Sequence, residues 1–200
     1  MPVFLKRRQD ILPAGYTRLA YIETTGSNFG KTGYLANRNT NLTIETDYKP
    51  SKAGDFLFGK RNSGRGSNFS IAGHKNKMRF DFGLDTKTMA YQPSGWYTLE
   101  IKPGPYPEAP SGWRTLVLIN GQVQDDATST YPQLDANYEL YIAACNSGGS
   151  VSGNAEPGSK IGKIIIRESG EIVRNYIPCK RLSDNEPGWW DTVTKTFMDF

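Results

Sequence analysis

The amino-acid sequence predicts an all-β protein in which two antiparallel sheets pack face to face as a sandwich or jelly roll. Apolar and polar side chains alternate with a period of two in several segments, and no segment shows the period of an amphipathic helix. Glycine and proline account for 21 and 12 of the 200 residues, which is typical of short strands joined by turns. Two short turn signals also lie between apolar runs. We therefore expect about ten or more closely spaced strands.

Each alternating segment predicts a strand with one face on a core and the other face on water. In the first of them, Leu42, Ile44 and Tyr48 fall on one face, whereas Glu45 and Asp47 fall on the other. The segments with this pattern are residues 41–49, 77–82, 96–102 and 138–144.

Two hairpins are also predicted. Asn120-Gly121 is the strongest short hairpin signal, and it lies between two strand-like runs. Ser169-Gly170 is a second short turn, and Pro178 is expected to end the strand that follows it. The hairpin strands are predicted at residues 115–119 with 122–124 and at 161–167 with 171–177, and further strands at 18–24, 55–60 and 68–72.

The length of 200 residues suits one domain, which we place at residues 12–200 behind an N-terminal arm of residues 1–11. The apolar run of this arm is too short for a secretory signal, and its basic residues follow the run instead of preceding it. No apolar stretch reaches the roughly 18 residues of a membrane span, so no membrane contact is expected. The arm is the expected docking tether, through Phe4, Leu5, Lys6, Arg7 and Arg8.

Both ends of the chain carry blocks that resemble a known family. Residues 12–26 read LPAGYTRLAYIETTG, residues 172–181 read IVRNYIPCKR, and residues 188–191 and 195–197 read GWWD and KTF. Together they resemble the concanavalin A-like (laminin G-like) sandwich modules of bacteriophage structural proteins and gut-bacterial surface proteins. The resemblance spans about residues 12–198 and implies a concanavalin A-like jelly-roll sandwich.

The resemblance also implies a function. It indicates a non-enzymatic structural and adhesion protein of the phage virion surface, such as a head decoration, fibre or tail module. Its expected partners are other virion proteins or its own copies, together with host or environmental glycans, and its expected location is the virion, assembled in the host cytoplasm. Ala20, Asn175 and Trp189-Trp190 depart from the family's usual residues, so no site residue is carried over. A glycan-binding, lectin-like bacterial surface protein is the alternative.

A glycoside hydrolase is the less favoured alternative, and one segment bears on it directly. Some sandwiches of this kind place three acids on one strand face as E-x-D-x-E, and retaining hydrolysis needs two carboxyl groups about 5–5.5 Å apart. Here Glu45 and Asp47 share a face about 6–7 Å apart. The third position is Lys49, which has no carboxyl group to act as acid or base. We therefore expect no enzymatic activity.

Exposed aromatic side chains are the best candidates for stacking on sugar rings. Tyr106 and Trp113 lie in a proline-rich excursion and are the first candidates, for a glycan or for a neighbouring subunit. Tyr91, Trp96 and Tyr131 come next. Of these, Trp96 begins a predicted strand, and we expect it to pack inside.

A second candidate surface is a basic loop between residues 59 and 77. The net charge of +4 is compatible with an anionic neighbour, although a solvated surface is the favoured explanation. The loop lacks the aromatic interleaving of single-strand binders, so nucleic acid is disfavoured, and a solvated loop or an interface with an acidic protein is favoured. Its cationic residues are Lys60, Arg61, Arg65, Lys75 and Lys77.

No cofactor is expected, because His74 is the only histidine and no zinc spacing is present. Calcium is the one candidate metal, through Asp125, Asp126 and Asp135, but these residues lack EF-hand spacing. Two cysteines, Cys145 and Cys179, end apolar runs; without a secretory signal we expect free, half-buried thiols, with a disulfide as the alternative if their strands are neighbours.

Overall fold

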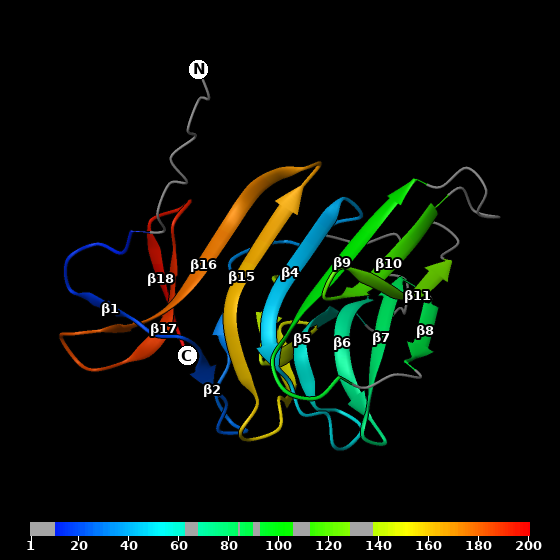
Figure 1. Cartoon of the computed structure of the whole chain (residues 1–200), viewed down its shortest axis with the longest axis horizontal. Coiled ribbons are helices and arrows are strands. Elements are labelled where there is room, and N and C mark those ends of the chain that lie inside the picture. The colour runs from blue at the N-terminus through cyan, green and yellow to red at the C-terminus, as the bar shows by residue number, and fades with distance from the viewer. Residues whose placement is uncertain (1–10, 63–67, 84, 90–92, 106–112, 129–137) are drawn as a thin grey trace.

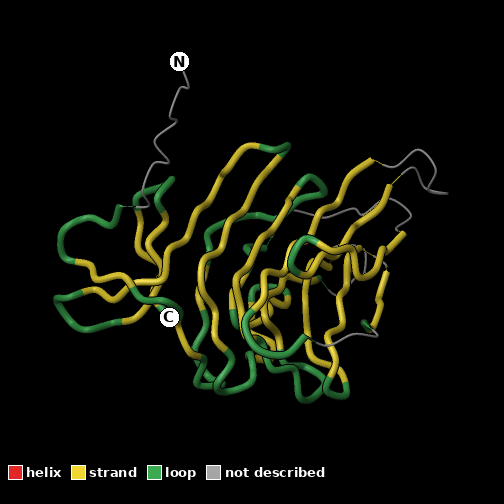
Figure 2. The backbone as a smooth tube through the Cα atoms, in the orientation of Figure 1, coloured by secondary structure: helices red, strands yellow, loops and turns green. Residues whose placement is uncertain are grey.

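The computed structural model describes residues 11–62, 68–83, 85–89, 93–105, 113–128 and 138–200, with the backbone alone at residues 85–87, 113 and 125–128. These residues form strands that assemble into two stacked sheets (Figure 1). Figure 2 shows strands joined by loops, and the described segments contain no helix. None of them could therefore cross a membrane as a long apolar helix. The predicted all-β sandwich is confirmed.

The large sheet has ten strands, and every strand pairing in it is antiparallel. Its main path runs β11-β10-β9-β4-β15-β16-β17-β18, while β1 pairs with β16 and β2 pairs with β15. The strands are β1 (Tyr16–Arg18), β2 (Ile22–Glu23), β4 (Thr40–Asp47), β9 (Tyr97–Pro105), β10 (Trp113–Ile119), β11 (Gln122–Thr128), β15 (Lys160–Glu168), β16 (Glu171–Arg181), β17 (Pro187–Asp191) and β18 (Thr196–Asp199).

The small sheet has eight strands in the order β14-β13-β5-β6-β7-β8, with β12 pairing with β3 and β5. The pairing of β13 with β5 is parallel, which departs from the expectation of purely antiparallel sheets. The strands are β3 (Gly30–Lys31), β5 (Phe56–Arg61), β6 (Asn68–His74), β7 (Lys77–Gly83), β8 (Asp85–Thr88), β12 (Tyr141–Ile142), β13 (Ala144–Ser147) and β14 (Ser150–Asn154).

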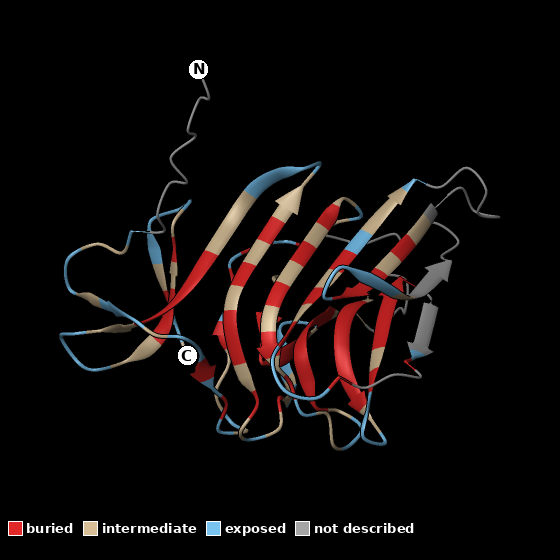
Figure 3. Ribbon diagram, in the orientation of Figure 1, coloured by how far each residue is buried: buried red, intermediate tan, exposed pale blue. Residues whose placement is uncertain are grey.

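The core lies between the two sheets and follows the predicted alternation. Along β4, Leu42, Ile44 and Thr46 are buried, whereas the alternate residues Thr43, Glu45 and Asp47 are half-buried; Tyr48, just after the strand, is buried as well. Figure 3 shows this striping on several strands of the large sheet. Trp189 of β17 is fully buried, and its Nε1 atom donates a hydrogen bond to the Gly162 carbonyl over 2.9 Å. Burying one large apolar side chain stabilises the fold by about 1.5–3 kcal/mol.

Both predicted hairpin turns form. Asn120 and Gly121 have φ angles of 51° and 79°, and Ser169 and Gly170 have 51° and 92°. Two successive left-handed residues give the type I′ turn, whose twist matches that of paired strands. A third turn of this kind joins β6 to β7 at Lys75-Asn76, where the sequence carries no glycine signal.

Two predicted strands end differently in the structure. The segment 138–144 is not one strand, because Ala143 has a left-handed φ of 61° and separates β12 from β13. Pro178 does not end its strand, since β16 continues to Arg181. The Pro178 carbonyl accepts a bond from the Leu19 amide, on the side away from β17. In an antiparallel sheet the N–H and C=O groups of one residue point to the same neighbouring strand. At residue 178 these groups point away from β17, so the missing N–H of proline removes no hydrogen bond to β17.

The two terminal blocks meet in the large sheet. β1 pairs with the end of β16, with Arg18 opposite Cys179. The Tyr16 ring lies 5.0 Å from the Trp190 ring and 5.3 Å from the Phe197 ring, measured between centroids. These contacts close the edge of the sandwich.

The two cysteines lie in different sheets, Cys145 on β13 and Cys179 on β16. Both are free thiols, and both are fully buried rather than half-buried. Burial raises the pKa of Cys145 to about 12 and the pKa of Cys179 to about 11.

Candidate binding face

The outer face of the large sheet carries most of the features that suit ligand binding. β9, β4 and β15 lie side by side, and each turns every second side chain away from the core. We call this surface the outer face. It is made of Trp96, Thr98, Glu100 and Lys102 at β9; Asn41, Thr43, Glu45 and Asp47 on β4; and Lys160, Lys163, Ile165 and Arg167 on β15.

Two aromatic rings lie together at one end of the outer face. Trp96, just before β9, is 48% exposed, and Tyr21, just before β2, is 38% exposed. Their ring centroids are 6.1 Å apart with an angle of 52° between the planes. We call this pair the aromatic platform. Exposed aromatic rings that pack together on a polar surface are a common mark of a binding site.

A glycine holds the platform in place. The Trp96 ring lies so close to Gly162 of β15 that a Cβ atom there would come within 2.8 Å of Trp96 Cζ2. From the core side, Trp189 donates its indole hydrogen bond to the carbonyl of the same glycine. The backbone at Gly162 is thus fixed from below and supports the indole above, so the ring is positioned before any ligand arrives.

Charged side chains surround the platform. The Lys160 Nζ atom lies 4.9 Å from the centroid of the Tyr21 ring, within the range of a cation–π interaction. Lys160 stands opposite Asp47 on β4 and Glu23 on β2 in the strand register. The platform is therefore flanked by cationic and anionic groups that can donate to, or accept from, the hydroxyl groups of a ligand.

A hollow of about 380 Å³ lies at the other end of the outer face. Arg167 faces Asn41 across the strand register, and its Nη1 atom reaches Thr43 Oγ1 over 3.5 Å, the outer limit of a hydrogen bond. Lys102 Nζ lies 2.7 Å from Glu100 Oε2. The hollow extends to Thr43 on β4, and the Trp96 ring lies beside Glu45, two residues and about 7 Å further along the strand. We call this depression the Arg167 hollow; it is lined by Asn41, Leu42, Thr43, Glu100, Lys102, Ile165 and Arg167.

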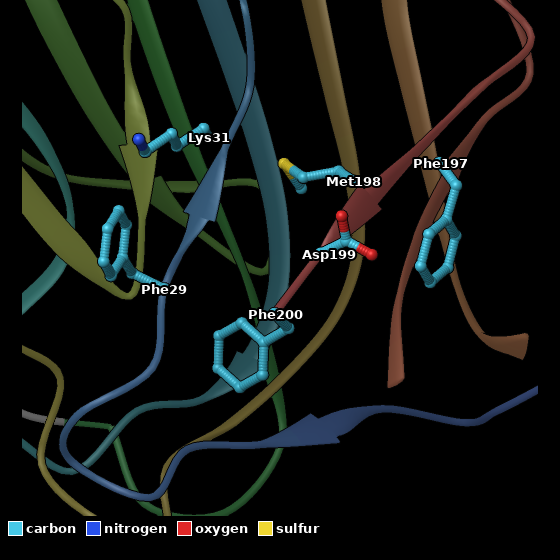
Figure 4. A pocket seen from close by; sticks show the side chains of 6 residues that line it. All are labelled: Phe29, Lys31, Phe197, Met198, Asp199 and Phe200. Carbon is cyan, nitrogen blue, oxygen red and sulfur yellow. The ribbon is translucent and has the colours of Figure 1, made fainter. Parts of the chain in front are cut away.

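A pocket of about 290 Å³ lies between β3 and β18, and Figure 4 shows the six side chains that line it. Met198 is packed against Gly30, because a Cβ atom at residue 30 would come within 3.0 Å of its sulfur. The Phe200 ring meets the buried Trp189 ring edge-on at 5.0 Å. The contact between Gly30 and Met198 joins the small sheet to the edge strand of the large sheet, which is a packing role.

A pocket of about 360 Å³ lies among the loops near residues 25–27, 52–55 and 153–157. The buried Asp55 carboxylate accepts hydrogen bonds from the backbone amides of Ser51 and Lys52 and from the Ser51 hydroxyl. All three bonds end on Oδ2, so this oxygen holds the turn before β5. No group of three or more His, Cys, Asp or Glu side chains in the described segments could hold a metal ion.

Most of the aromatic residues that the sequence singled out cannot be placed. Tyr91, Tyr106 and Tyr131 lie outside the described residues, and Trp113 begins β10 with its side chain outside them. The docking arm also lies outside the described residues, with Phe4, Leu5, Lys6, Arg7 and Arg8. Of the calcium candidates, Asp135 lies outside them, whereas Asp125 and Asp126 are described by backbone alone in β11. These assignments stay predictions.

The basic residues between 59 and 77 do not form one loop. Lys60 belongs to β5 and is only 1% exposed, and Arg61 ends the same strand. Lys75 and Lys77 lie at the far end of β6, because Lys60 pairs with Phe69 whereas Lys77 pairs with His74. The length of β6, about 17 Å between those two partners, separates the groups. Arg65 is outside the described residues.

The sequence interpretation of Trp96 was wrong, and Tyr21 was missed. The signal for Trp96 was present in its own strand, because Tyr97, Leu99 and Ile101 face the core and residue 96 therefore faces outward. Nothing in the local pattern near Tyr21 indicates that β2 joins β15 and brings the two rings together. Glu45 and Asp47 do face outward together, and Lys49 is exposed, as the alternation predicted.

No known family model matches the chain, and no curated protein matches it. Among solved structures it is similar to a putative carbohydrate binding protein from Bacteroides ovatus, with 10% identity and a TM-score of 0.59, over 92% of this chain and 58% of that protein. The chain therefore shares the β-sandwich fold of that protein. The chain is also similar to the CBM40 of a Ruminococcus gnavus IT-sialidase, with 11% identity and a TM-score of 0.48, over 75% of this chain and 90% of that one. It is similar as well to mouse laminin α1 domains LG4-5, with 14% identity and a TM-score of 0.45, over 80% of this chain and 48% of that one.

Proposed function

We propose that this chain is a carbohydrate-binding module that holds a glycan on the outer face of its large sheet. The observation that carries the proposal is the aromatic platform, in which Trp96 and Tyr21 expose adjacent rings on an otherwise polar surface. The apolar C–H face of a sugar ring packs on an aromatic ring, while its hydroxyl groups need polar partners at the edge. Lys160, Asp47 and Glu45 provide such partners beside the platform.

The proposal is for binding without cleavage. Glu45 and Asp47 are adjacent outward residues of β4 and lie about 7 Å apart along the strand. Both are half-exposed on an open sheet face, whereas a glycosidase acid is usually kept protonated by an apolar or enclosed setting. The third position of the strand motif is the exposed Lys49. The fold of a putative carbohydrate binding protein from Bacteroides ovatus is in keeping with this reading.

Affinity electrophoresis through gels that contain soluble polysaccharides tests the proposal. We expect retardation by at least one polysaccharide and at least a tenfold loss of affinity in Trp96→Ala, about 1.4 kcal/mol. Val193→Ala is the matched control, because Val193 is 45% exposed in the turn after β17. Retardation that survives unchanged in Trp96→Ala would exclude the platform. Release of reducing sugar by the wild type, lost in Glu45→Gln, would contradict binding without cleavage.

The setting that we propose for this module is the surface of a bacteriophage particle, where it would dock on other virion proteins or on its own copies. The resemblance of the two terminal blocks to phage structural modules supports this setting, and those blocks pair with each other in β1 and β16. Mass spectrometry of purified particles tests it. We expect the chain to be present in stoichiometric amounts, and to be lost from particles when residues 1–9 are deleted; its absence from particles would refute the setting.

A further inference from the structure

We infer that the ligand is a uronate-containing glycan chain and that Arg167 receives one of its carboxylates. This inference rests on the proposed function and assigns the chemical class of the glycan. It depends on the Arg167 hollow, next to the aromatic platform along β4.

The guanidinium of Arg167 is available in the hollow. Its contact with Thr43 is 3.5 Å long, and no described carboxylate forms an ion pair with it. Arginine carries a planar fork of donors that matches the two oxygens of a carboxylate, and it stays charged at all working pH values. A guanidinium group that forms no ion pair with a described carboxylate, and that lies at the wall of a hollow, can bind an anionic group there.

The charge balance of the hollow favours an anion. Two cations, Lys102 and Arg167, and one carboxylate, Glu100, line it, which leaves one net positive charge. Glu100 is already neutralised by Lys102, because their charged atoms are 2.7 Å apart. The positive charge that remains is therefore located on Arg167.

The rest of the hollow suits a sugar ring that bears the carboxylate. Ile165 supplies apolar surface, and Asn41 and Thr43 supply an amide and a hydroxyl group. A sugar ring has the same combination of an apolar face and hydroxyl groups at its edge. A uronate adds the carboxylate that the fork of Arg167 would receive.

The hollow and the platform lie next to each other along β4. The hollow extends to Thr43, whereas the Trp96 ring lies over Gly162 beside Glu45, two residues further along the strand. The two are therefore about 7 Å apart along the strand. Neighbouring sugar rings of one chain can occupy the hollow and the platform together, which favours a chain as the ligand.

Calorimetry with oligogalacturonate and its methyl ester tests the inference, because the two chains differ only in that each carboxylate of the ester carries a methyl group and has lost its charge. We expect the wild type to bind the uronate at least tenfold more tightly than the ester, with an affinity that falls as salt is added. Arg167→Gln should lower the affinity for the uronate about tenfold and leave the affinity for the ester unchanged. Lys195→Gln is the control, because it removes one positive charge from an exposed turn at the far edge of the sheet.

The outcomes separate this inference from the proposed function. Equal affinity of the wild type for both chains would overturn the inference, and so would unchanged uronate binding in Arg167→Gln. If Trp96→Ala weakened the binding of both chains while Arg167→Gln weakened neither, the carbohydrate function would stand without the charged subsite. If no polysaccharide of any charge bound, both proposals would fall. Equal thermal midpoints of the variants and the wild type would show that the fold is retained.

Discussion

The indole of Trp96 lies on the backbone of Gly162, and the carbonyl of that glycine is bound from the core side by Trp189. One residue without a side chain thus links the core of the sandwich to an exposed aromatic ring. This relationship explains why a large apolar side chain can remain on the surface in a defined position. It also makes the platform sensitive to changes in residues that touch no ligand.

Gly162→Ala should therefore weaken glycan binding. The added Cβ atom would meet Trp96 at 2.8 Å and Glu45 Cβ at 3.3 Å, so the indole must move. We expect a several-fold loss of affinity, measured by calorimetry, and a loss of stability of about 1–3 kcal/mol, measured by urea unfolding. The double variant with Trp96→Ala should bind no more weakly than Trp96→Ala alone, because Gly162 acts only through the indole. Additive losses in the double variant would contradict this role.

Trp189→Phe should destabilise the protein. The substitution removes the indole hydrogen bond to Gly162 and leaves space in the core where the larger ring is fully buried. We expect a loss of about 2–4 kcal/mol in urea unfolding. A change below about 0.5 kcal/mol would show that this bond does not anchor the glycine. Trp190→Phe is the control, since Trp190 is only half-buried.

Asp191 should be a large contributor to the stability of the C-terminal hairpin. Its buried carboxylate accepts bonds from the amides of Asn175 and Val193 and from the Thr194 hydroxyl, and it lies 3.5 Å from Arg174 Nε. Asp191→Ala leaves these groups without their acceptor, and we expect a loss of about 2–4 kcal/mol. Urea unfolding measures it. Asp199→Ala, at an exposed carboxylate, should cost under about 1 kcal/mol, and similar losses for both variants would count against the network.

Both thiols should resist labelling in the folded protein. Burial raises the pKa of Cys145 to about 12 and that of Cys179 to about 11, so neither forms a thiolate near pH 8. A thiol reagent should label both only in denaturant. Because the folded pKa values exceed the ordinary value of 9.0, stability from the neutral thiols is present below about pH 9 and is lost as the pH rises toward 11 and 12. Rapid labelling of the native protein at pH 8 would refute the burial of these residues.

Local patterns predicted much of this fold. The alternation in residues 41–49 placed Leu42 and Ile44 in the core and Glu45 and Asp47 outside, and Asn120-Gly121 formed the expected type I′ turn. These features depend only on neighbours along the chain. The break at Ala143 was not predictable, because alanine rarely adopts a left-handed conformation and does so here through tertiary contacts.

Most of the candidate site could not be predicted from local sequence patterns. The outward direction of Trp96 follows from its position before Tyr97, but its meeting with Tyr21 depends on the pairing of β2 with β15. The Arg167 hollow likewise requires residue 41 to lie beside residue 167. Such long-range register is set by the packing of the whole sandwich and not by any short motif.

The most direct test of the account is a glycan titration that follows the four indole N–H signals of the ¹⁵N-labelled protein, assigned with single Trp→Phe variants. We predict that a bound polysaccharide shifts the Trp96 signal, whereas the signal of the buried Trp189 stays in place. A shift of the Trp113 signal with no change in the Trp96 signal would indicate that the glycan binds at the proline-rich excursion instead. Saturating binding that leaves Trp96 unaffected would contradict the aromatic platform as the glycan site.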